Sequence, residues 1–269
     1  MAVRNAYAEA VRNDDIISTR VSDETKMIKE AIYYVDAGEE EGAQWKRIRS
    51  SLNQPVEKFK RKDKGKNVAA AWGKATAIIH ATPELVLSWQ WFLDSNGRKK
   101  VHIEFTGDLI RRVKYIPQSR TQLCDFGYSF PGTNRLFSVK NVWGKTSSSE
   151  GVERFVITGK TRDVDKKDFD AIERDFGKFI KVGVKQVFVI EKIAPSVCRA
   201  TYAAQIDLRG RIPTALMDTQ ISNALDILKD MYEKFERRGK DVDAEVGCAD
   251  EFLVARGKGG SRRMGDALI

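Results

Sequence analysis

The feature that most constrains the fold is one long amphipathic segment near the C-terminal end of the chain. From residue 213 to residue 238, apolar side chains recur every three or four positions, which predicts a helix with a continuous apolar stripe. Pro213 suits the first helical turn, and Arg237-Arg238-Gly239 supplies a basic last turn followed by glycine. Such a stripe must be buried against another element. It consists of Met217, Ile221, Ala224, Leu225, Leu228, Met231 and Phe235.

An antiparallel sheet is the expected partner for this stripe. Short apolar runs bounded by turn residues follow one another through the middle of the chain, which is typical of antiparallel strands. Two more strands are expected on either side of the basic turn at 60–66, and helices are expected at 23–36, 83–95 and 168–180. The central strands are expected at 109–116, 121–128, 136–143, 152–159, 184–193 and 197–208.

Composition predicts a globular protein that can bury a core. Of the 269 residues, 42% are hydrophobic and 32% are charged. No apolar run approaches the roughly 18 residues of a membrane span, and the first 20 residues contain no apolar signal-peptide region. Three widely spaced cysteines favour a reducing, cytoplasmic setting. We expect a lead-in at 1–20, one domain at 21–240 and a tail at 241–269.

The scarcity of histidine argues against metal binding and against most hydrolytic catalysis. His80 and His102 are the only histidines, and no CxxC or HxxxH spacing occurs, so a zinc site is not expected. Two Gly-Lys-Thr triplets, at 144–146 and 159–161, lack the earlier glycine of a phosphate-binding loop. We therefore expect no catalytic residues, no metal and no cofactor.

Three segments resemble the START (steroidogenic acute regulatory protein-related lipid transfer) domain. Asp207-Leu208-Arg209-Gly210-Arg211-Ile212-Pro213 resembles the family's signature at the start of its last helix. Residues 128–135 resemble its strand–Pro–x–x–Asn–Arg segment, although Leu136 stands where the family usually has Asp. Residues 72–87 resemble the strand that leads into its second helix. Together they cover about 40–238 and resemble a divergent, protist-type member of the START/Bet v 1-like superfamily.

The resemblance implies an α+β helix-grip fold, in which a curved antiparallel β-sheet wraps around the long C-terminal helix and encloses an apolar cavity. It also implies non-catalytic binding or transfer of one lipid, such as a sterol or a phospholipid, gated by that helix. Enclosing an apolar molecule removes its surface from water, at about 25 cal/mol per Å². Two alternatives stay open: an enzyme on this scaffold, such as a cyclase or hydrolase, that uses Arg154, His102 or Glu104, and a membrane or protein adaptor with a vestigial cavity.

Strand alternation and helix position predict which side chains contact the ligand. We expect alternate residues of each strand to face inward, and the polar ones among them to bind a phosphate, carbonyl or hydroxyl group. In the last helix we expect contact near its first turns, where the family's lid meets the cavity. The predicted ligand-binding residues are Phe137, Val139, Asn141, Trp143, Arg154, Gln186, Phe188, Thr201, Gln205, Leu216, Met217, Gln220 and Ile221.

The net charge of +9 points to an anionic partner. Lys60, Arg61, Lys62 and Lys64 lie in one basic turn, which we interpret as a docking site for anionic membrane lipids. The alternative is a solvated hairpin tip that keeps the protein soluble. No nucleic-acid-binding motif is present, so nucleic acid is not expected as a partner. We expect a monomer located in the cytoplasm and peripheral to membranes.

Overall fold

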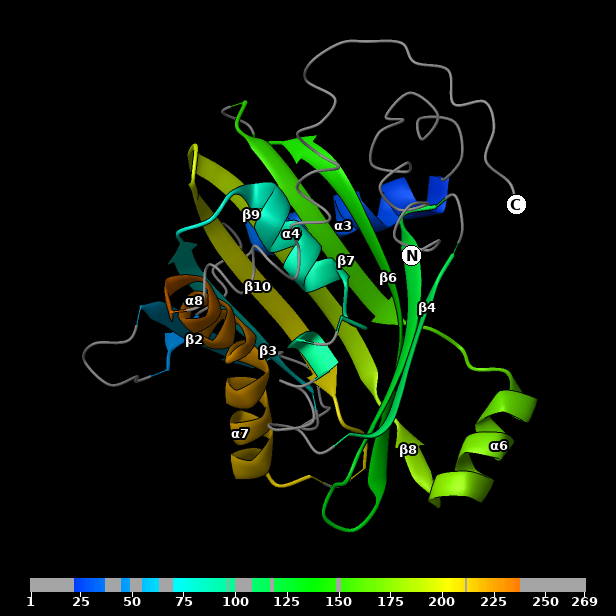
Figure 1. Cartoon of the computed structure of the whole chain (residues 1–269). Coiled ribbons are helices and arrows are strands. Elements are labelled where there is room, and N and C mark those ends of the chain that lie inside the picture. The colour runs from blue at the N-terminus through cyan, green and yellow to red at the C-terminus, as the bar shows by residue number, and fades with distance from the viewer. Residues whose placement is uncertain are drawn as a thin grey trace, which may run out of the picture.

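The computed structural model describes residues 22–36, 45–48, 55–62, 70–95, 97–99, 108–116, 119–148, 151–210 and 212–237. Its strands form one large sheet in the order β1-β2-β3-β10-β9-β7-β6-β5-β4, with β8 added in parallel to β6 and every other pairing antiparallel (Figure 1). The strands are β1 (Lys46–Arg47), β2 (Val56–Lys62), β3 (Ala70–Ile79), β4 (Asp108–Tyr115), β5 (Thr121–Tyr128), β6 (Asn134–Ser147), β7 (Glu153–Thr161), β8 (Phe179–Lys181), β9 (Gly183–Ala194) and β10 (Val197–Asp207).

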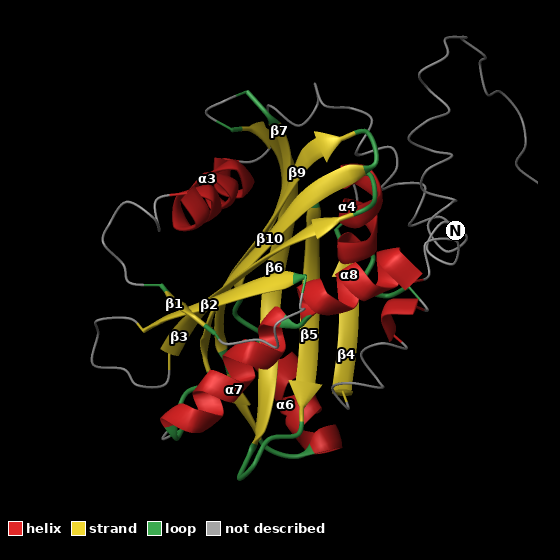
Figure 2. Ribbon diagram, turned by 90° about the vertical axis from the view of Figure 1, so that its left-hand side faces the viewer, coloured by secondary structure: helices red, strands yellow, loops and turns green. Residues whose placement is uncertain are grey.

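Helices cover both faces of the sheet. The inner face carries α4 (Pro83–Trp91), α7 (Thr214–Leu225) and α8 (Ile227–Arg237), and these elements bury the main apolar core. The outer face carries α3 (Ser22–Asp36) and α6 (Lys166–Phe176), each over a smaller apolar cluster. Figure 2 shows α3 on the side of the sheet opposite to α4 and α8. The inner face is thus the side beneath α4, α7 and α8, and the outer face is the side beneath α3 and α6.

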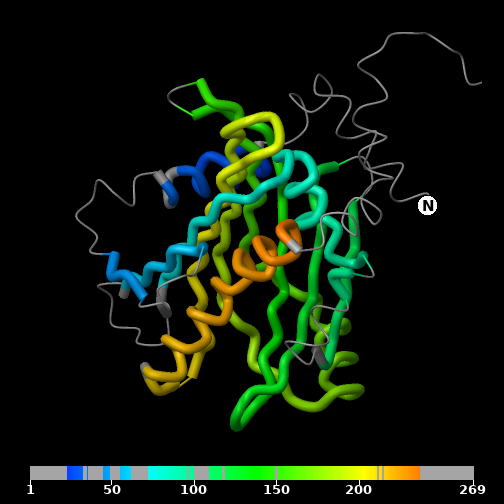
Figure 3. The backbone as a smooth tube through the Cα atoms, turned by 60° about the vertical axis from the view of Figure 1, so that its left-hand side comes forward, coloured from blue at the N-terminus to red at the C-terminus, as the bar shows by residue number. Residues whose placement is uncertain are grey.

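The last helical segment lies directly on β3 and β10. Figure 3 shows α7 and α8 crossing these strands. Small residues make this close approach possible, since the inner face carries Gly73 and Ala75 on β3 and Ala204 on β10. A Cβ atom on Gly73 would lie 2.7 Å from the Ile221 side chain, so α7 touches the sheet at this point.

The expected single helix at 213–238 is interrupted. Asp226 separates α7 from α8, and its N–H donates to the Asn223 carbonyl, which closes a tight turn. The apolar stripe continues through the interruption, because Leu225 and Leu228 are both fully buried. The apolar spacing that predicted one helix therefore corresponds to one buried stripe that runs along two consecutive helices.

The junction before α7 depends on left-handed backbone. Arg209 has φ +53° and Gly210 has φ +79°, and the Asp207 carboxylate accepts a hydrogen bond from the Arg209 N–H at 3.0 Å. Glycine adopts this conformation without a steric penalty. The motif that carries the family resemblance thus forms the turn between β10 and α7.

The element order matches the sequence predictions closely. All six central strands and the helices near 23–36 and 83–95 are confirmed within a few residues, whereas the helix expected at 168–180 ends at Phe176, and Phe179 and Ile180 lie in β8. The strand β1 was not predicted, because a strand of two residues carries no readable alternation. The strand β8 was predicted as helix, because Phe179 continues the apolar spacing of Ile172 and Phe176. Within the described ranges, none of the helices is both long and apolar enough to cross a lipid bilayer.

Candidate functional site

A row of polar side chains crosses the inner face of the sheet. The strand registers place Gln122 on β5 opposite Asn141 on β6, Asn141 opposite Gly159 on β7, and Gly159 opposite Gln186 on β9. Tyr202 lies on β10, one step along the same face. Four strands therefore bring neutral amide and phenol groups together within an otherwise apolar core, and the fifth, β7, lies among them with Gly159.

These side chains form a hydrogen-bond chain that runs in one direction. The Tyr202 hydroxyl donates to Gln186 Oε1 at 3.0 Å, and Gln186 Nε2 donates to Asn141 Oδ1 at 2.9 Å. Asn141 Nδ2 donates to Gln122 Oε1 at 3.5 Å, and Gln122 Nε2 donates to the Trp91 carbonyl at 2.9 Å. The last bond ties the chain to the end of α4. Successive bonds in one direction polarise one another, which strengthens such a chain.

Glycine at position 159 lets this chain pass across β7. A Cβ atom there would lie 2.1 Å from Asn141 Oδ1 and 2.8 Å from Gln186 Nε2. Any side chain would therefore occupy the space in which the two amides meet. Gly159 was dismissed as part of a false phosphate-loop triplet at the sequence level, and the structure gives it this different role.

Burial holds one phenol and two thiols of the inner face in their neutral forms. Burial raises the pKa of the Tyr202 hydroxyl above its usual value. Burial, followed by the nearby Asp125 carboxylate, raises the pKa of Cys124 to about 12, and burial raises that of Cys198 to about 12. A thiol is nucleophilic as the thiolate, so neither of these cysteines is suited to covalent catalysis at neutral pH.

Arg98 places a buried cation beside this core. The Arg98 side chain is 3% exposed, lies with its guanidinium 5.6 Å from the centre of the Trp89 ring, and has an Nε atom without a hydrogen-bond partner. Burial, and then the neighbouring Arg111, lower the pKa of Arg98 to about 10, so it stays charged at neutral pH. The Asp230 carboxylate of α8 has the opposite effect and raises the pKa of Arg98. Among the described residues, no carboxylate forms a salt bridge with Arg98.

Two lysine–aspartate pairs hold α7 to strand β2. Lys58 Nζ contacts the Asp226 carboxylate and the Ser222 carbonyl, and the Lys58 side chain is only 7% exposed. Lys60 Nζ lies 2.6 Å from Asp218 Oδ2. Asp218 lies on α7 and Asp226 caps its C-terminal end, and this spacing of about two helical turns directs both carboxylates toward β2. We call these contacts the latch.

Most of the predicted ligand-binding residues lie on the inner face or on α7. The structure places Phe137, Val139, Trp143 and Phe188 in or against the main core, and Asn141 and Gln186 in the polar chain. Met217 and Ile221 of α7 are buried in the main core. Leu216 and Gln220 are partly exposed on the same helix. Ligand contact by these residues stays a prediction.

Three of the predicted ligand-binding residues lie on the outer face instead of the inner face. Arg154 lies on the outer face, 2.7 Å from the Glu191 carboxylate, and Thr201 lies on the outer face with its Oγ1 3.3 Å from that of Thr76. Gln205 shares this side of β10 with Ala203, which packs beneath α3. The facing of Arg154, Thr201 and Gln205 was therefore wrong, since the sequence does not reveal which side of an alternating strand meets the core.

Two residues of the predicted membrane-docking turn, Lys60 and Arg61, contact other parts of the protein. Lys60 belongs to the latch, and the Arg61 guanidinium lies 5.2 Å from the centre of the Trp45 ring and 5.6 Å from that of Trp72. Lys62 ends β2, and Lys64 lies outside the described residues. His102 and Glu104, two of the three residues considered for catalysis, also lie outside the described residues.

The sequence interpretation missed Gln122, Cys124, Tyr202 and Arg98. The signal for Tyr202 was present, because Cys198, Ala200, Tyr202, Ala204 and Ile206 form a more apolar alternate set than the one chosen for β10. Gln122 and Cys124 likewise share one face of β5 with Phe126 and Tyr128, because the four residues are spaced two apart. Arg98 follows a helix rather than a strand, and no periodicity marks it.

Comparison with solved structures identifies proteins that share this fold. Human STARD10 matches with a TM-score of 0.59 at 13% identity, covering 89% of this chain and 90% of that one. The lipid transfer and protein localization domain of human StarD13 matches with a TM-score of 0.52 at 15% identity, covering 80% and 98%. This chain has the START fold.

A bacterial protein structure also shares this fold. The STAR-related lipid transfer protein from Xanthomonas axonopodis matches with a TM-score of 0.51 at 12% identity, covering 72% of this chain and 99% of that one. No protein-family model matches the sequence, and no curated protein matches it. The chain thus has the START fold, with a helix across the inner face, at 12–15% identity to these structures.

Proposed function

We propose that the protein binds one lipid-like molecule on the inner face, beneath α4, α7 and α8, and transfers it between membranes. The observation that carries this proposal is the buried polar chain from Tyr202 to Gln122 within an apolar core. The START fold supports it, because it is shared with the lipid transfer and protein localization domain of human StarD13 and with a STAR-related lipid transfer protein from Xanthomonas axonopodis.

The chemistry of the inner face favours binding over catalysis. The polar chain consists of neutral amides and a phenol, and both Cys124 beside it and Cys198 on β10 are protonated at neutral pH. Arg154, the cation considered for an enzyme, lies on the outer face in a salt bridge. Neutral amides suit a hydroxyl or carbonyl group of a ligand, whereas Arg98 suits an acidic group.

Ligand entry requires α7 to move, because α7 touches the sheet at Gly73. The latch opposes this movement. We therefore expect the double variant D218N/D226N to transfer lipid between vesicles several times faster than the unaltered protein. The cause is that loss of two charged contacts lowers the cost of lifting α7, by about 1–2 kcal/mol in total, since both aspartates are partly exposed.

The measurement is movement of a fluorescent phospholipid between donor and acceptor vesicles. The matched control is D163N/D165N, which removes two exposed carboxylates that lie just before α6, away from the latch. This control should leave the rate unchanged. Absence of transfer by the unaltered protein for phospholipid, sterol and fatty acid probes alike would overturn the proposed function.

A further inference from the structure

Lysines occupy paired positions on three neighbouring strands of the outer face. Lys140 of β6 lies opposite Lys160 of β7, and Lys160 lies opposite Lys185 of β9. Adjacent strands are about 4.8 Å apart, so three positive charges form a row about 10 Å long. Like charges placed directly opposite each other destabilise a sheet. Within the described residues, no carboxylate forms a salt bridge with Lys140 or Lys160.

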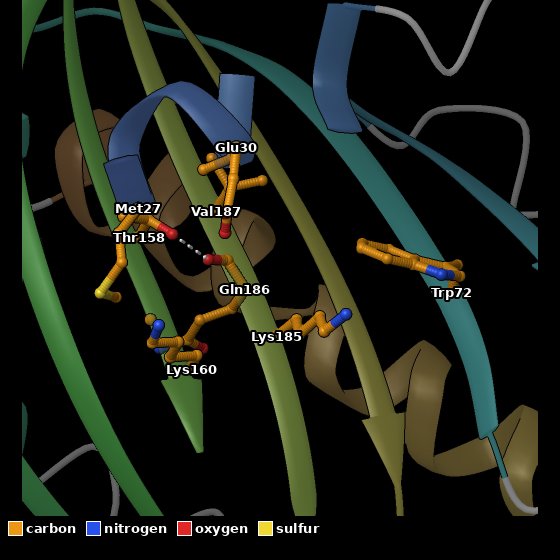
Figure 4. A pocket seen from close by; sticks show the side chains of 10 residues that line it. Met27, Glu30, Trp72, Thr158, Lys160, Lys185, Gln186 and Val187 are labelled. Atoms are coloured by element: carbon orange, nitrogen blue, oxygen red, sulfur yellow. Dashed lines mark hydrogen bonds between the residues drawn. The ribbon is translucent and has the colours of Figure 1, made fainter. Parts of the chain in front are cut away.

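A pocket lies beside this lysine row. Its volume is about 60 Å³, and it lies between α3 and the sheet (Figure 4). Met27 and Glu30 of α3 form one side, Lys160 and Lys185 the opposite side, and Trp72 one end. The pocket thus combines an apolar wall with two ammonium groups, while Glu30 repels anions from the far side.

The row is flanked by two helices but covered by neither. On β6, Leu136 packs beneath α6 and a Cβ on Gly144 would touch Ile28 of α3, while Lys140 lies midway between these two positions. Lys160 and Lys185 are exposed. A soluble molecule or a headgroup can therefore reach all three lysines from the solvent.

We propose that Lys140, Lys160 and Lys185, with the pocket beside α3, form a binding site for a phosphate-bearing ligand on the outer face. A carboxylate would neutralise one charge of the row, whereas a phosphomonoester carries nearly two negative charges and three acceptor oxygens. Lysine binds phosphate as a point charge, and three together suit more than one phosphoryl oxygen. This site lies on the opposite face of the sheet from the proposed lipid site and goes beyond that function.

The test compares two charge-matched double variants of the full chain. K140Q/K160Q removes two lysines of the row, and K167Q/K178Q removes two exposed lysines on and after α6. Inorganic tripolyphosphate is titrated into each protein by calorimetry. We expect its Kd to rise at least tenfold in K140Q/K160Q and to stay within twofold in K167Q/K178Q. Equal Kd values in the two variants, or no binding to the unaltered protein, would overturn the proposal.

Thermal unfolding supplies an independent reading that does not need the ligand. In phosphate-free buffer K140Q/K160Q should melt at a higher temperature than the unaltered protein, because like-charge repulsion has been removed. Tripolyphosphate should then raise the melting temperature of the unaltered protein and not that of K140Q/K160Q. A lower melting temperature for K140Q/K160Q without ligand would show a structural role for the row and contradict the proposal.

Vesicles distinguish the two sources of phosphate. Phosphatidylcholine vesicles containing one-tenth phosphatidic acid present the same phosphomonoester on a membrane. Binding to them that tripolyphosphate displaces and K140Q/K160Q lacks identifies a lipid headgroup as the source. Binding of tripolyphosphate without binding of these vesicles identifies a free phosphorylated molecule. Both results support the site, and vesicle binding that K140Q/K160Q retains in full, with no tripolyphosphate binding, contradicts it.

Discussion

Replacement of Gly159 by alanine is expected to destabilise the protein by about 2–6 kcal/mol. The added methyl group would lie 2.1 Å from Asn141 Oδ1, which forces the Asn141 and Gln186 amides apart. Overpacking of a core costs about 1–3 kcal/mol, and a buried polar group left without its partner costs a further 1–3 kcal/mol. The effect would be seen as a lower midpoint of urea unfolding.

The control for this variant is G183A on the neighbouring strand β9. A Cβ atom there would meet the Asp207 side chain at 3.2 Å, a contact that can relax. We expect G183A to lower the free energy of unfolding by less than about 1 kcal/mol. Equal stability of G159A and the unaltered protein would show that the polar chain does not depend on close passage across β7.

Replacement of Arg98 by methionine is expected to stabilise the protein and to weaken binding of an acidic ligand. Methionine fills similar space against Trp89 without a buried charge, and we expect a gain of about 1–2 kcal/mol in the free energy of unfolding. If Arg98 contacts an acidic headgroup, the Kd for a fatty acid or an acidic phospholipid should rise tenfold or more, about 1.4 kcal/mol.

R98K provides the matched comparison, because it retains the charge and should retain most of the acidic-ligand affinity. R174M, at an exposed position of α6, should change neither stability nor binding. A gain in stability with unchanged acidic-ligand affinity would assign Arg98 no role in binding. A loss of stability in R98M would show instead that the guanidinium is satisfied in the folded protein.

The sequence predicted the fold well because the fold depends on periodicity. The apolar stripe of the last helical segment and the alternation of six strands are both visible in the residue order, and the turn at Asp207 and Gly210 marks where one gives way to the other. The interruption at Asp226 was not visible, since Leu225 and Leu228 keep the stripe continuous across it.

The candidate site was predicted only in part because it depends on which face of each strand meets the core. Both faces of this sheet are covered by helices, so both alternate sets of β10 contain buried residues, among them Thr201 and Tyr202. Alternation alone cannot choose between them. Asn141 and Gln186 face inward as expected, and their contact with a ligand stays a prediction, whereas Gly159 and Arg98 acquire their roles only through contacts between distant segments.

The central claim is that the inner face encloses one ligand molecule, and native mass spectrometry of the full chain tests it most directly. The account predicts a complex of one chain with one lipid-like molecule, released as an intact lipid on collisional activation and carried at lower occupancy by D218N/D226N. A spectrum that shows only the bare chain, both as purified and after incubation with mixed phospholipid and sterol vesicles, would contradict the account.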